Sequence, residues 1–247
     1  ILPFSGDDTA DGGAYIDLFI MDAGDDTAHG REGIDVMFGG GGADELNGGN
    51  CIDVIFGEGG DDIIIGGDGQ KLEIGSFSIE LGDVLFGGLG NDALFGDFQS
   101  GNGTGIDVAF GGLGNDEMRL ADGGDMVIGS FELKLGNVAF GNGGNDEIES
   151  KKGICVLFGQ SGSDTISSDE GAVLEFSSGN FELALGDVIF AGDDNDTVDS
   201  DADDGTQDID FVFAGAGDDV VRAYDGGMLT VGSFEFMLGN LVFGRAG

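Results

Sequence analysis

Apolar residues recur along this chain at a regular interval and are separated by glycine-rich stretches. One series consists of a valine, a second apolar residue and a phenylalanine, and its shortest repeat is 18 residues, as between Phe38 and Phe56. A repeat of this kind predicts a solenoid, in which each coil contributes short strands to a shared core. The shortest coil contains two turns and two strands. The phenylalanines of the series are Phe19, Phe38, Phe56, Phe86, Phe110, Phe140, Phe158, Phe190, Phe213 and Phe243.

The half-coil that follows each phenylalanine, here termed side A, has a nearly constant pattern. An aspartate is followed two residues later by one apolar residue, as in Asp44 and Leu46. Because strand side chains alternate, this pattern predicts very short strands with one inward side chain and polar outward neighbours. Side A is therefore expected to face water. Its aspartates, with the first two as looser members, are Asp8, Asp26, Asp44, Asp62, Asp92, Asp116, Asp146, Asp164, Asp196 and Asp219.

The half-coil that ends in each phenylalanine, here termed side B, is apolar on both strand faces and therefore needs a cover. The longer coils carry inserts that can provide it. A Gly-Ser pair inside the first insert predicts a β-hairpin that places Leu72 opposite Ile79 and Ile74 opposite Phe77. The four inserts are residues 71–81, 125–135, 173–185 and 228–238.

The inserted coils alternate with bare coils through the middle of the chain, so we expect the hairpins to stack into one outer sheet over the valine and phenylalanine face. The alternative, that the inserts are independent loops, is weaker because their lengths match. The predicted fold is all-β: a parallel β-roll or β-solenoid with an extra layer of stacked β-hairpins. Residues 1–247 are expected to form a single unit of about ten coils.

The repeated aspartate indicates a metal-binding chain. The sequence contains 49 acidic and eight basic residues, for a formal net charge of −41. Stacked coils would place the side-A carboxylates about 4.8 Å apart, where two of them repel by roughly 3–4 kcal/mol at an effective dielectric near 20. Calcium suits such a column because it accepts carboxylate and carbonyl oxygens in flexible geometry. Zinc would require histidine or cysteine ligands, and magnesium usually retains several waters.

The side-A turns carry the nonapeptide Gly-Gly-x-Gly-x-Asp-x-apolar-x, most clearly at residues 39–47, 57–65, 87–95, 111–119 and 141–149. This motif resembles the RTX repeat of calcium-dependent β-roll proteins, and the resemblance covers nearly the whole chain through side A. It implies several Ca²⁺ ions held by calcium-binding turns of successive coils, with the side-A aspartates as ligands. It also implies type I secretion and folding outside the cell. The turn glycines in this role are Gly39, Gly41, Gly57, Gly59, Gly87, Gly111, Gly141 and Gly143.

Side B carries a second polar column, three residues before each phenylalanine. Asp53 is a further candidate calcium ligand because it follows a short glycine turn. For most other members we favour capping of the strand through loop amides, because Asn137 and Cys155 interrupt the column. The remaining members are Asp35, Asp83, Asp107, Asp187, Asp210 and Asn240.

Several functions and features are not expected. Because the chain has so few basic residues, we expect neither nucleic acid nor an anionic membrane surface as a partner. No apolar stretch is long enough for membrane insertion. Paired carboxylates recur with the coil, whereas an active site is singular, so we expect no enzyme. Cys51 and Cys155 lie too many coils apart for a disulfide. Since Ile1 begins neither an initiator sequence nor a signal peptide, we expect a processed, excised or partly captured chain.

We expect a secreted protein, extracellular or at the cell surface, that folds on calcium and has a structural role. Both ends of the printed chain lack a visible polar cap, and open solenoid ends are pairing edges. Head-to-tail self-association into a surface layer, filament or matrix is therefore the first expectation. The alternatives are the C-terminal folding and secretion module of a larger type I-secreted toxin, protease or lipase, and an adhesin stalk.

Overall fold

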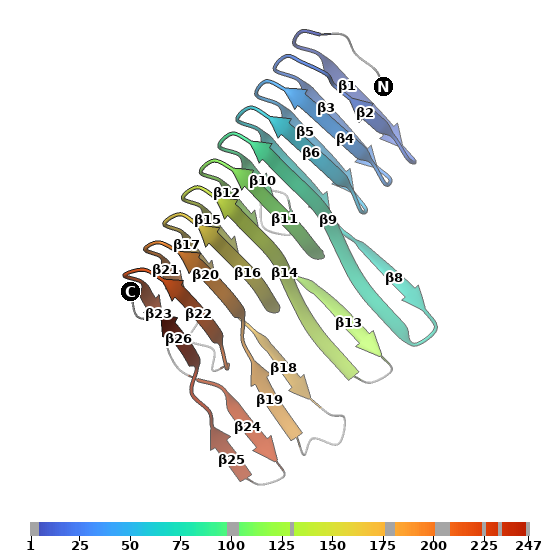
Figure 1. Ribbon diagram of the computed structural model, residues 1–247. Coiled ribbons are helices and arrows are strands. Elements are labelled where there is room, and N and C mark those ends of the chain that lie inside the picture. Colours follow the sequence, from blue (N-terminus) through green and yellow to red (C-terminus); the bar gives the residue numbers. More distant parts are fainter. Residues whose placement is uncertain are drawn as a thin grey trace.

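A computed structural model of the chain describes residues 5–97, 104–128, 131–175, 181–200, 208–223, 226–231 and 234–245. Two parallel β-sheets lie face to face, and successive coils add one strand to each of them (Figure 1). No helix occurs in these residues. The predicted all-β parallel roll is confirmed.

The side-A sheet is built from short strands that each follow a turn aspartate. The strands pair in parallel and in a constant register, so that Leu46 lies beside Ile64 and Ile64 beside Leu94. In spatial order they are β1 (Thr9–Ala14), β3 (Thr27–Glu32), β5 (Glu45–Asn50), β7 (Ile63–Asp68), β10 (Ala93–Phe95), β12 (Glu117–Leu120), β15 (Glu147–Ser150), β17 (Thr165–Ser168), β21 (Thr197–Asp199) and β23 (Val220–Arg222).

The side-B sheet contains the valine and phenylalanine series. Its strands also pair in parallel, with phenylalanine beside phenylalanine from Phe38 to Phe243. In spatial order they are β2 (Leu18–Ile20), β4 (Val36–Gly41), β6 (Val54–Gly59), β9 (Phe77–Leu89), β11 (Ile106–Leu113), β14 (Phe131–Gly143), β16 (Ile154–Ser161), β20 (Val188–Asp193), β22 (Phe211–Ala216) and β26 (Leu241–Arg245).

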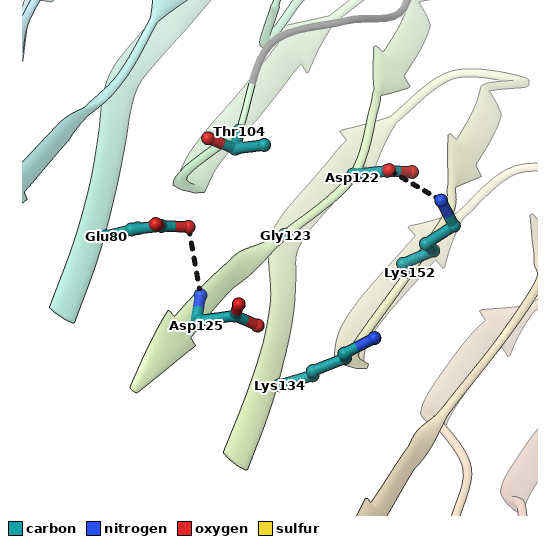
Figure 2. A pocket seen from close by; sticks show the side chains of 7 residues that line it. All are labelled: Glu80, Thr104, Asp122, Gly123, Asp125, Lys134 and Lys152. Carbon is teal, nitrogen blue, oxygen red and sulfur yellow. Dashed lines mark hydrogen bonds and ion pairs between the residues drawn. The ribbon is translucent and has the colours of Figure 1, made fainter. Parts of the chain in front are cut away.

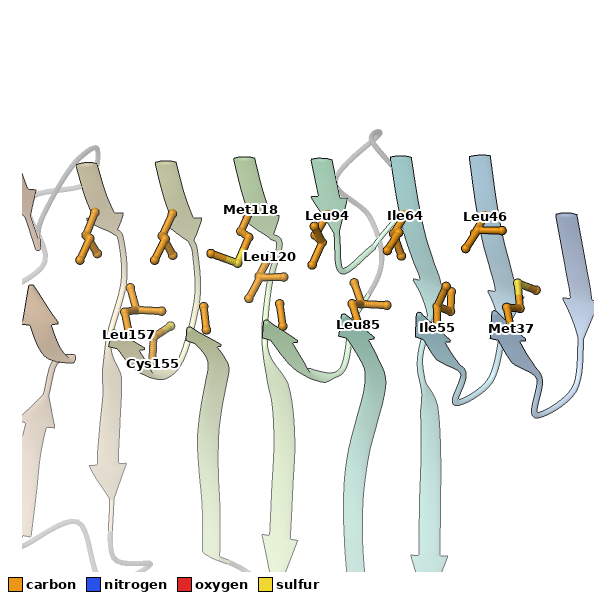
Figure 3. Packing of buried hydrophobic residues seen from close by; sticks show 14 of the residues in the cluster. Met37, Leu46, Ile55, Ile64, Leu85, Leu94, Met118, Leu120, Cys155 and Leu157 are labelled. Atoms are coloured by element: carbon orange, nitrogen blue, oxygen red, sulfur yellow. The ribbon is translucent and has the colours of Figure 1, made fainter. Parts of the chain in front are cut away.

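The core is a double row of apolar side chains between the two sheets. Figure 3 shows Leu46, Ile64 and Leu94 from side A facing Ile55 and Leu85 from side B. All five side chains are fully buried. Burial of one such side chain contributes about 1.5–3 kcal/mol, so each coil adds to the stability of the roll, and coils with a smaller core residue such as Ala109 or Ala139 add less.

The register of the first coil differs from the sequence prediction. Phe19 is fully buried and pairs with Met37, while Ile20 pairs with Phe38 on the outward face. The prediction that Phe19 begins the phenylalanine column was therefore wrong. The register is set by Asp17, whose backbone N–H donates to Asp35 Oδ1 at 2.8 Å and which lies three residues before Ile20.

The inserts form hairpins as predicted. In the first, Leu72 pairs with Ile79 and Ile74 with Phe77, and Gly75 occupies the turn with a φ of 65°. The turn residues 129–130, 176–180 and 232–233 of the other inserts lie outside the described residues. The added strands are β8 (Gln70–Ile74), β13 (Gly124–Ile128), β18 (Ala172–Glu175), β19 (Phe181–Leu185), β24 (Met228–Val231) and β25 (Phe234–Met237).

The placement of the hairpins overturns the expectation of a covering layer. β9 and β14 are single strands of 13 residues that run from a hairpin directly into the side-B sheet. The hairpins therefore prolong the sheet beyond the roll instead of folding over it (Figure 1). They stack in two groups, β8-β9-β13-β14 and β18-β19-β24-β25, and the described residues show no ladder joining the groups. A strand that continues without a turn cannot reverse over its own sheet.

Both cysteines are free thiols, as predicted, and Cys155 is buried. Among the described residues there is no helix of the length and hydropathy that crossing a bilayer requires.

Candidate metal centre

The side-A turns bring one aspartate per coil into a column at the edge of the roll. The backbone N–H of each aspartate donates to Oδ1 of the aspartate in the next coil, for example from Asp44 to Asp62 at 2.8 Å and from Asp62 to Asp92 at 2.9 Å. Asp8 and Asp219 extend the column at its two ends, at 2.7 Å to Asp26 and at 3.1 Å from Asp196. The structure thus aligns all ten predicted side-A aspartates.

Only one oxygen of each carboxylate is used in this way. The second oxygen, Oδ2, is buried and has no hydrogen-bond partner, although a buried polar atom without a partner costs about 1–3 kcal/mol, and more when charged. The arrangement therefore leaves a row of oxygens that require a cation or a proton. The side-A aspartates with an unpartnered Oδ2 are Asp26, Asp44, Asp62, Asp92, Asp116, Asp146, Asp164 and Asp196.

The first glycine of each turn makes room for this oxygen. A Cβ added to Gly57 would overlap Asp62 Oδ2 and would lie 2.7 Å from the carbonyl oxygen of Gly87 in the next coil. A carboxylate oxygen and a backbone carbonyl therefore converge on the same crowded point. The predicted turn glycines that lie in this position are Gly39, Gly57, Gly87, Gly111 and Gly141.

The other predicted glycines have different roles. A Cβ on Gly41 or Gly59 would meet no atom closer than 3.8 Å, and on Gly143 none closer than 3.3 Å. The stringent position of the turn is the one that follows, as at Gly60. Its φ is +133°, and a side chain there would overlap the Gly42 carbonyl oxygen of the preceding coil.

A second, exposed polar column lies beside the first and was missed by the sequence analysis. Asp61 Oδ1 accepts a hydrogen bond from the backbone N–H of Asn91 at 2.8 Å, and Asn91 Oδ1 accepts one from Asn115 at 2.8 Å. These side chains stitch successive turns together from outside. The signal was present in the sequence, because position five of the nonapeptide is Asp or Asn in most coils.

Side B repeats the side-A geometry over the first coils. The backbone N–H of Asp35 donates to Asp53 Oδ1 at 2.7 Å, and that of Asp53 donates to Asp83 Oδ1 at 2.6 Å. Capping of loop amides, the favoured interpretation, explains this oxygen only. Oδ2 is again buried and unpartnered in Asp35, Asp53, Asp83 and Asp107. The glycines that face these oxygens are Gly30, Gly48, Gly66 and Gly96.

Asp97 adds a carboxylate outside the repeat. It is 3% exposed, and neither of its oxygens has a hydrogen-bond partner. Burial, together with the smaller effect of the nearby Asp107 charge, raises the pKa of Asp97 to about 8. The sequence offered no signal for this residue, because Asp97 lies outside both repeated aspartate positions.

Beyond Asp107 the side-B edge changes its chemistry. The aspartate column continues through Asn137 and Cys155. At the positions that glycines occupy in the first coils, the later coils have Leu120 and then serines. Of these serines, Ser150 contacts the Cys155 thiol at 3.1 Å. Ser200 Oγ donates to Asp210 Oδ2 at 2.8 Å. The serine hydroxyl thus gives this carboxylate oxygen a hydrogen-bond donor, whereas the corresponding oxygens in the first coils would need a cation as their partner. Asp187 follows the same pattern, because burial raises the pKa of its carboxyl and a hydrogen bond with the Ser168 side chain partly opposes this larger effect.

The protonation behaviour of the columns follows from their burial. Burial raises the pKa of Asp62 to about 6 and that of Asp92 to about 7, although the backbone N–H of the preceding coil acts in the opposite direction. On side B, burial together with the neighbouring Asp107 charge raises the pKa of Asp83 to about 9. Asp62, Asp92 and Asp83 therefore bind a proton more readily than a solvent-exposed aspartate does when no cation is bound.

The donor set selects the type of metal. No three His, Cys, Asp or Glu side chains cluster around a common point in the described part of the chain. A cation at these edges must therefore combine one or two carboxylates with backbone carbonyls. Calcium accepts such an all-oxygen set in flexible geometry, whereas zinc requires nitrogen or sulfur ligands.

A shallow pocket beside the first hairpins has a different character (Figure 2). Lys152 Nζ contacts Asp122 Oδ2 at 2.9 Å, and the Asp125 N–H donates to Glu80 Oε2 at 3.4 Å. Gly123, Thr104 and Lys134 complete the lining. An exposed ion pair such as Lys152–Asp122 contributes about 0–1 kcal/mol, so we interpret the pocket as a polar surface depression and not as a binding site.

Comparison with known proteins points to the same chemistry. The family model of the RTX calcium-binding nonapeptide repeat matches residues 22–50, 52–70, 82–101, 102–130, 140–172, 186–207 and 204–226. These segments include turns of both edges. No curated protein and no solved structure matched the chain.

Proposed function

The chain belongs to the RTX calcium-binding nonapeptide repeat family, whose repeats bind Ca²⁺, and we propose that it is a secreted structural protein that folds on calcium and assembles outside the cell. The observation that carries this proposal is the row of buried, unpartnered carboxylate oxygens along both edges. With a formal charge of −41, the roll requires cations at these positions to become compact.

The calcium ions would be held by side-A carboxylates together with carbonyl oxygens of the adjoining turn. Bound calcium would neutralise the charge of the column and join adjacent coils. Extracellular calcium modules function with dissociation constants of about 10⁻⁴–10⁻³ M, so calcium-rich surroundings suffice to fill them. The proposed side-A ligand residues are Asp8, Asp26, Asp44, Asp62, Asp92, Asp116, Asp146, Asp164, Asp196 and Asp219, with the turn glycines Gly39, Gly41, Gly57, Gly59, Gly87, Gly111, Gly141 and Gly143.

On side B, calcium would bind only along the first coils, through Asp35, Asp53, Asp83 and Asp107. Support comes from their unpartnered oxygens and facing glycines, which match the side-A arrangement. Further along, asparagine, cysteine and serine replace the charged and glycine positions. The two edges would therefore differ in how many ions they hold.

A structural role is favoured over catalysis because the repeat itself is a calcium-binding element and the acidic groups recur from coil to coil. The proposal treats residues 1–247 as a single unit. End-to-end assembly is its finer part. It is supported by the constant register from β1 to β23, since a coil that pairs in this register can accept a coil of a second chain in the same way.

The experiment is small-angle scattering of the natural chain in excess calcium and in chelator, at several protein concentrations, with magnesium as the matched control. We expect an expanded chain in chelator and in magnesium, and a compact rod in calcium. A chain that stays compact in chelator near pH 8 would refute calcium-driven folding. Rods whose length grows with concentration support assembly, whereas rods of constant length would leave folding on calcium intact and refute the assembly.

A further inference from the structure

The outer face of the side-B sheet is apolar from end to end. Its phenylalanine rings, from Phe38 to Phe243, stack with centroids 4.6 to 5.0 Å apart and with ring planes within 10° of parallel. A second outward column, two residues earlier, runs from Leu18 through Val36 to Leu241 and is also apolar. Neither column contains a charged residue, in a chain whose formal charge is −41.

The strands of the first hairpins continue this face. Leu81 pairs with Ile106 and Val84 pairs with Val108, with a register shift between the two pairs. Ile106 and Val108 are two residues apart and therefore lie on one face of their strand. Because the bulge in β9 absorbs the additional residue, Leu81 lies on the same face as Val84.

The hairpin residues beyond the bulge are apolar on the same side. Ile79 and Phe77 alternate with Leu81 along β9, and their cross-strand partners are Leu72 and Ile74. Leu72 and Ile74 are 47% and 66% exposed, and Ile128 of the neighbouring hairpin is 51% exposed. The hairpins, which were predicted to cover the outer face of the side-B sheet, are thus part of the same exposed apolar surface.

This surface is large for a single chain. With strands about 4.8 Å apart and residues about 3.4 Å apart, the outward columns and the first hairpin group together span roughly 750 Å². The largest apolar patch of a typical monomer is about 300–600 Å². A stable interface takes about 800 Å² from each partner, so the face is close to the size that an interface between two copies needs.

We propose that the face pairs with the same face of a second copy of this chain, forming a two-sheet sandwich. The near-parallel rings show that successive strands scarcely twist, and flat sheets of many strands are typically stabilised by stacking. A second copy has the same spacing between successive strands, so its phenylalanine rings and valines can pack between those of the first copy along the whole sheet. The contact uses a different surface from end-to-end assembly, and the acidic turns remain at its margins.

The test is analytical ultracentrifugation of the natural chain in excess calcium, alongside three double variants. Phe86→Lys with Phe140→Lys alters the ring column, and Ile74→Lys with Ile128→Lys alters the hairpin part. Ile63→Lys with Val220→Lys is the matched control, because these residues are exposed on the side-A sheet.

We expect the natural chain and the control to pair through this face, as closed dimers or, where chains also join end to end, as rods two chains thick. Each face variant should raise the dimer dissociation constant by at least about 100-fold, since it places two charges per copy in an apolar contact. The exposed hairpin residues keep the test valid if the ring-column variant fails to fold, and circular dichroism identifies that case.

A natural chain that remains monomeric at every concentration would overturn the proposal. If such a monomer adsorbed to octyl-agarose, the face would instead be assigned to binding an apolar surface. Dimers that survive both sets of face substitutions would overturn it equally. Open polymers that are insensitive to the face variants would indicate end-to-end assembly alone and refute face pairing.

Discussion

Replacing Gly57 by alanine should destabilise the calcium-loaded chain, whereas the same replacement at Gly59 should not. The two glycines lie two residues apart in one turn, and neither has the positive φ that alanine avoids. The difference between them is therefore space. A Cβ on Gly57 would overlap Asp62 Oδ2, while a Cβ on Gly59 would lie 3.8 Å from its nearest neighbour, the Gly40 carbonyl oxygen.

The magnitude follows from what the added methyl group displaces. It would also lie 2.7 Å from the Gly87 carbonyl oxygen, so the carboxylate cannot move toward the next coil. Overpacking of this kind costs about 1–3 kcal/mol. Losing the 2.8 Å hydrogen bond from the Asp44 N–H to Asp62 Oδ1 costs about 1.5–3 kcal/mol more, because the acceptor is charged. The expected loss is roughly 3–5 kcal/mol, against a gain of about 0.4–1 kcal/mol for Gly59→Ala.

The assay is urea denaturation of both variants in saturating calcium, followed by circular dichroism. This measurement is preferable to the calcium midpoint of folding. If many ions bind together, a loss of about 4 kcal/mol is divided among them, and the midpoint shifts only slightly. The m-values should stay equal, since neither variant changes the surface exposed on unfolding.

Two results would refute the reasoning. Equal destabilisation by both variants would mean that the turn requires glycine for its backbone conformation at both positions. A neutral Gly57→Ala would mean that the carboxylate oxygen does not occupy the crowded position beside this glycine, and the metal assignment of the edge would lose its geometric basis.

Two further predictions concern charge. Asp62→Asn keeps the acceptor for the Asp44 N–H but removes a buried charge, so it should weaken calcium binding, whereas Asp61→Asn at the exposed neighbour should change it little; isothermal titration calorimetry compares them. Burial raises the pKa of Asp53 to about 7 and of Asp83 to about 9, so the calcium-free fold binds more protons than the unfolded chain. The stability of the calcium-free fold should therefore fall as pH rises from about 4 to about 9. In chelator, circular dichroism should show a larger folded fraction on acidification, and an unchanged folded fraction would contradict this.

The side-A edge could be predicted almost completely from the sequence. A nonapeptide repeat with one aspartate and one inward apolar residue has a single register in which Leu46, Ile64 and Leu94 share the core and Asp44 lies beside Asp62. Any slip by one residue would turn every inward side chain toward solvent. Composition then indicated calcium, since oxygen ligands recur without histidine or cysteine.

The side-B errors share one physical cause, because apolar patterning there is ambiguous. Leu18-Phe19-Ile20 is apolar at three successive positions, so its pattern does not indicate which residue points inward. The long-range hydrogen bond from the Asp17 N–H to Asp35 Oδ1 determines the register. The hairpins were placed as a cover because strands apolar on both faces are usually buried. The structure shows instead that β9 is one continuous strand, which passes from the hairpin into the side-B sheet through a bulge at Gly82 and Asp83.

The divergence of the side-B edge shows why a repeat count overstates the number of metal sites. An aspartate alone does not make a site; it needs an oxygen that nothing else satisfies and a facing residue small enough to leave it room. Asp83 meets both conditions, with Gly66 in front of it. Asp210 keeps the aspartate, but Ser200 donates to its Oδ2 at 2.8 Å, so the need for a cation is reduced. The later coils should therefore depend for calcium chiefly on side A, and for cohesion on their core and hairpin strands.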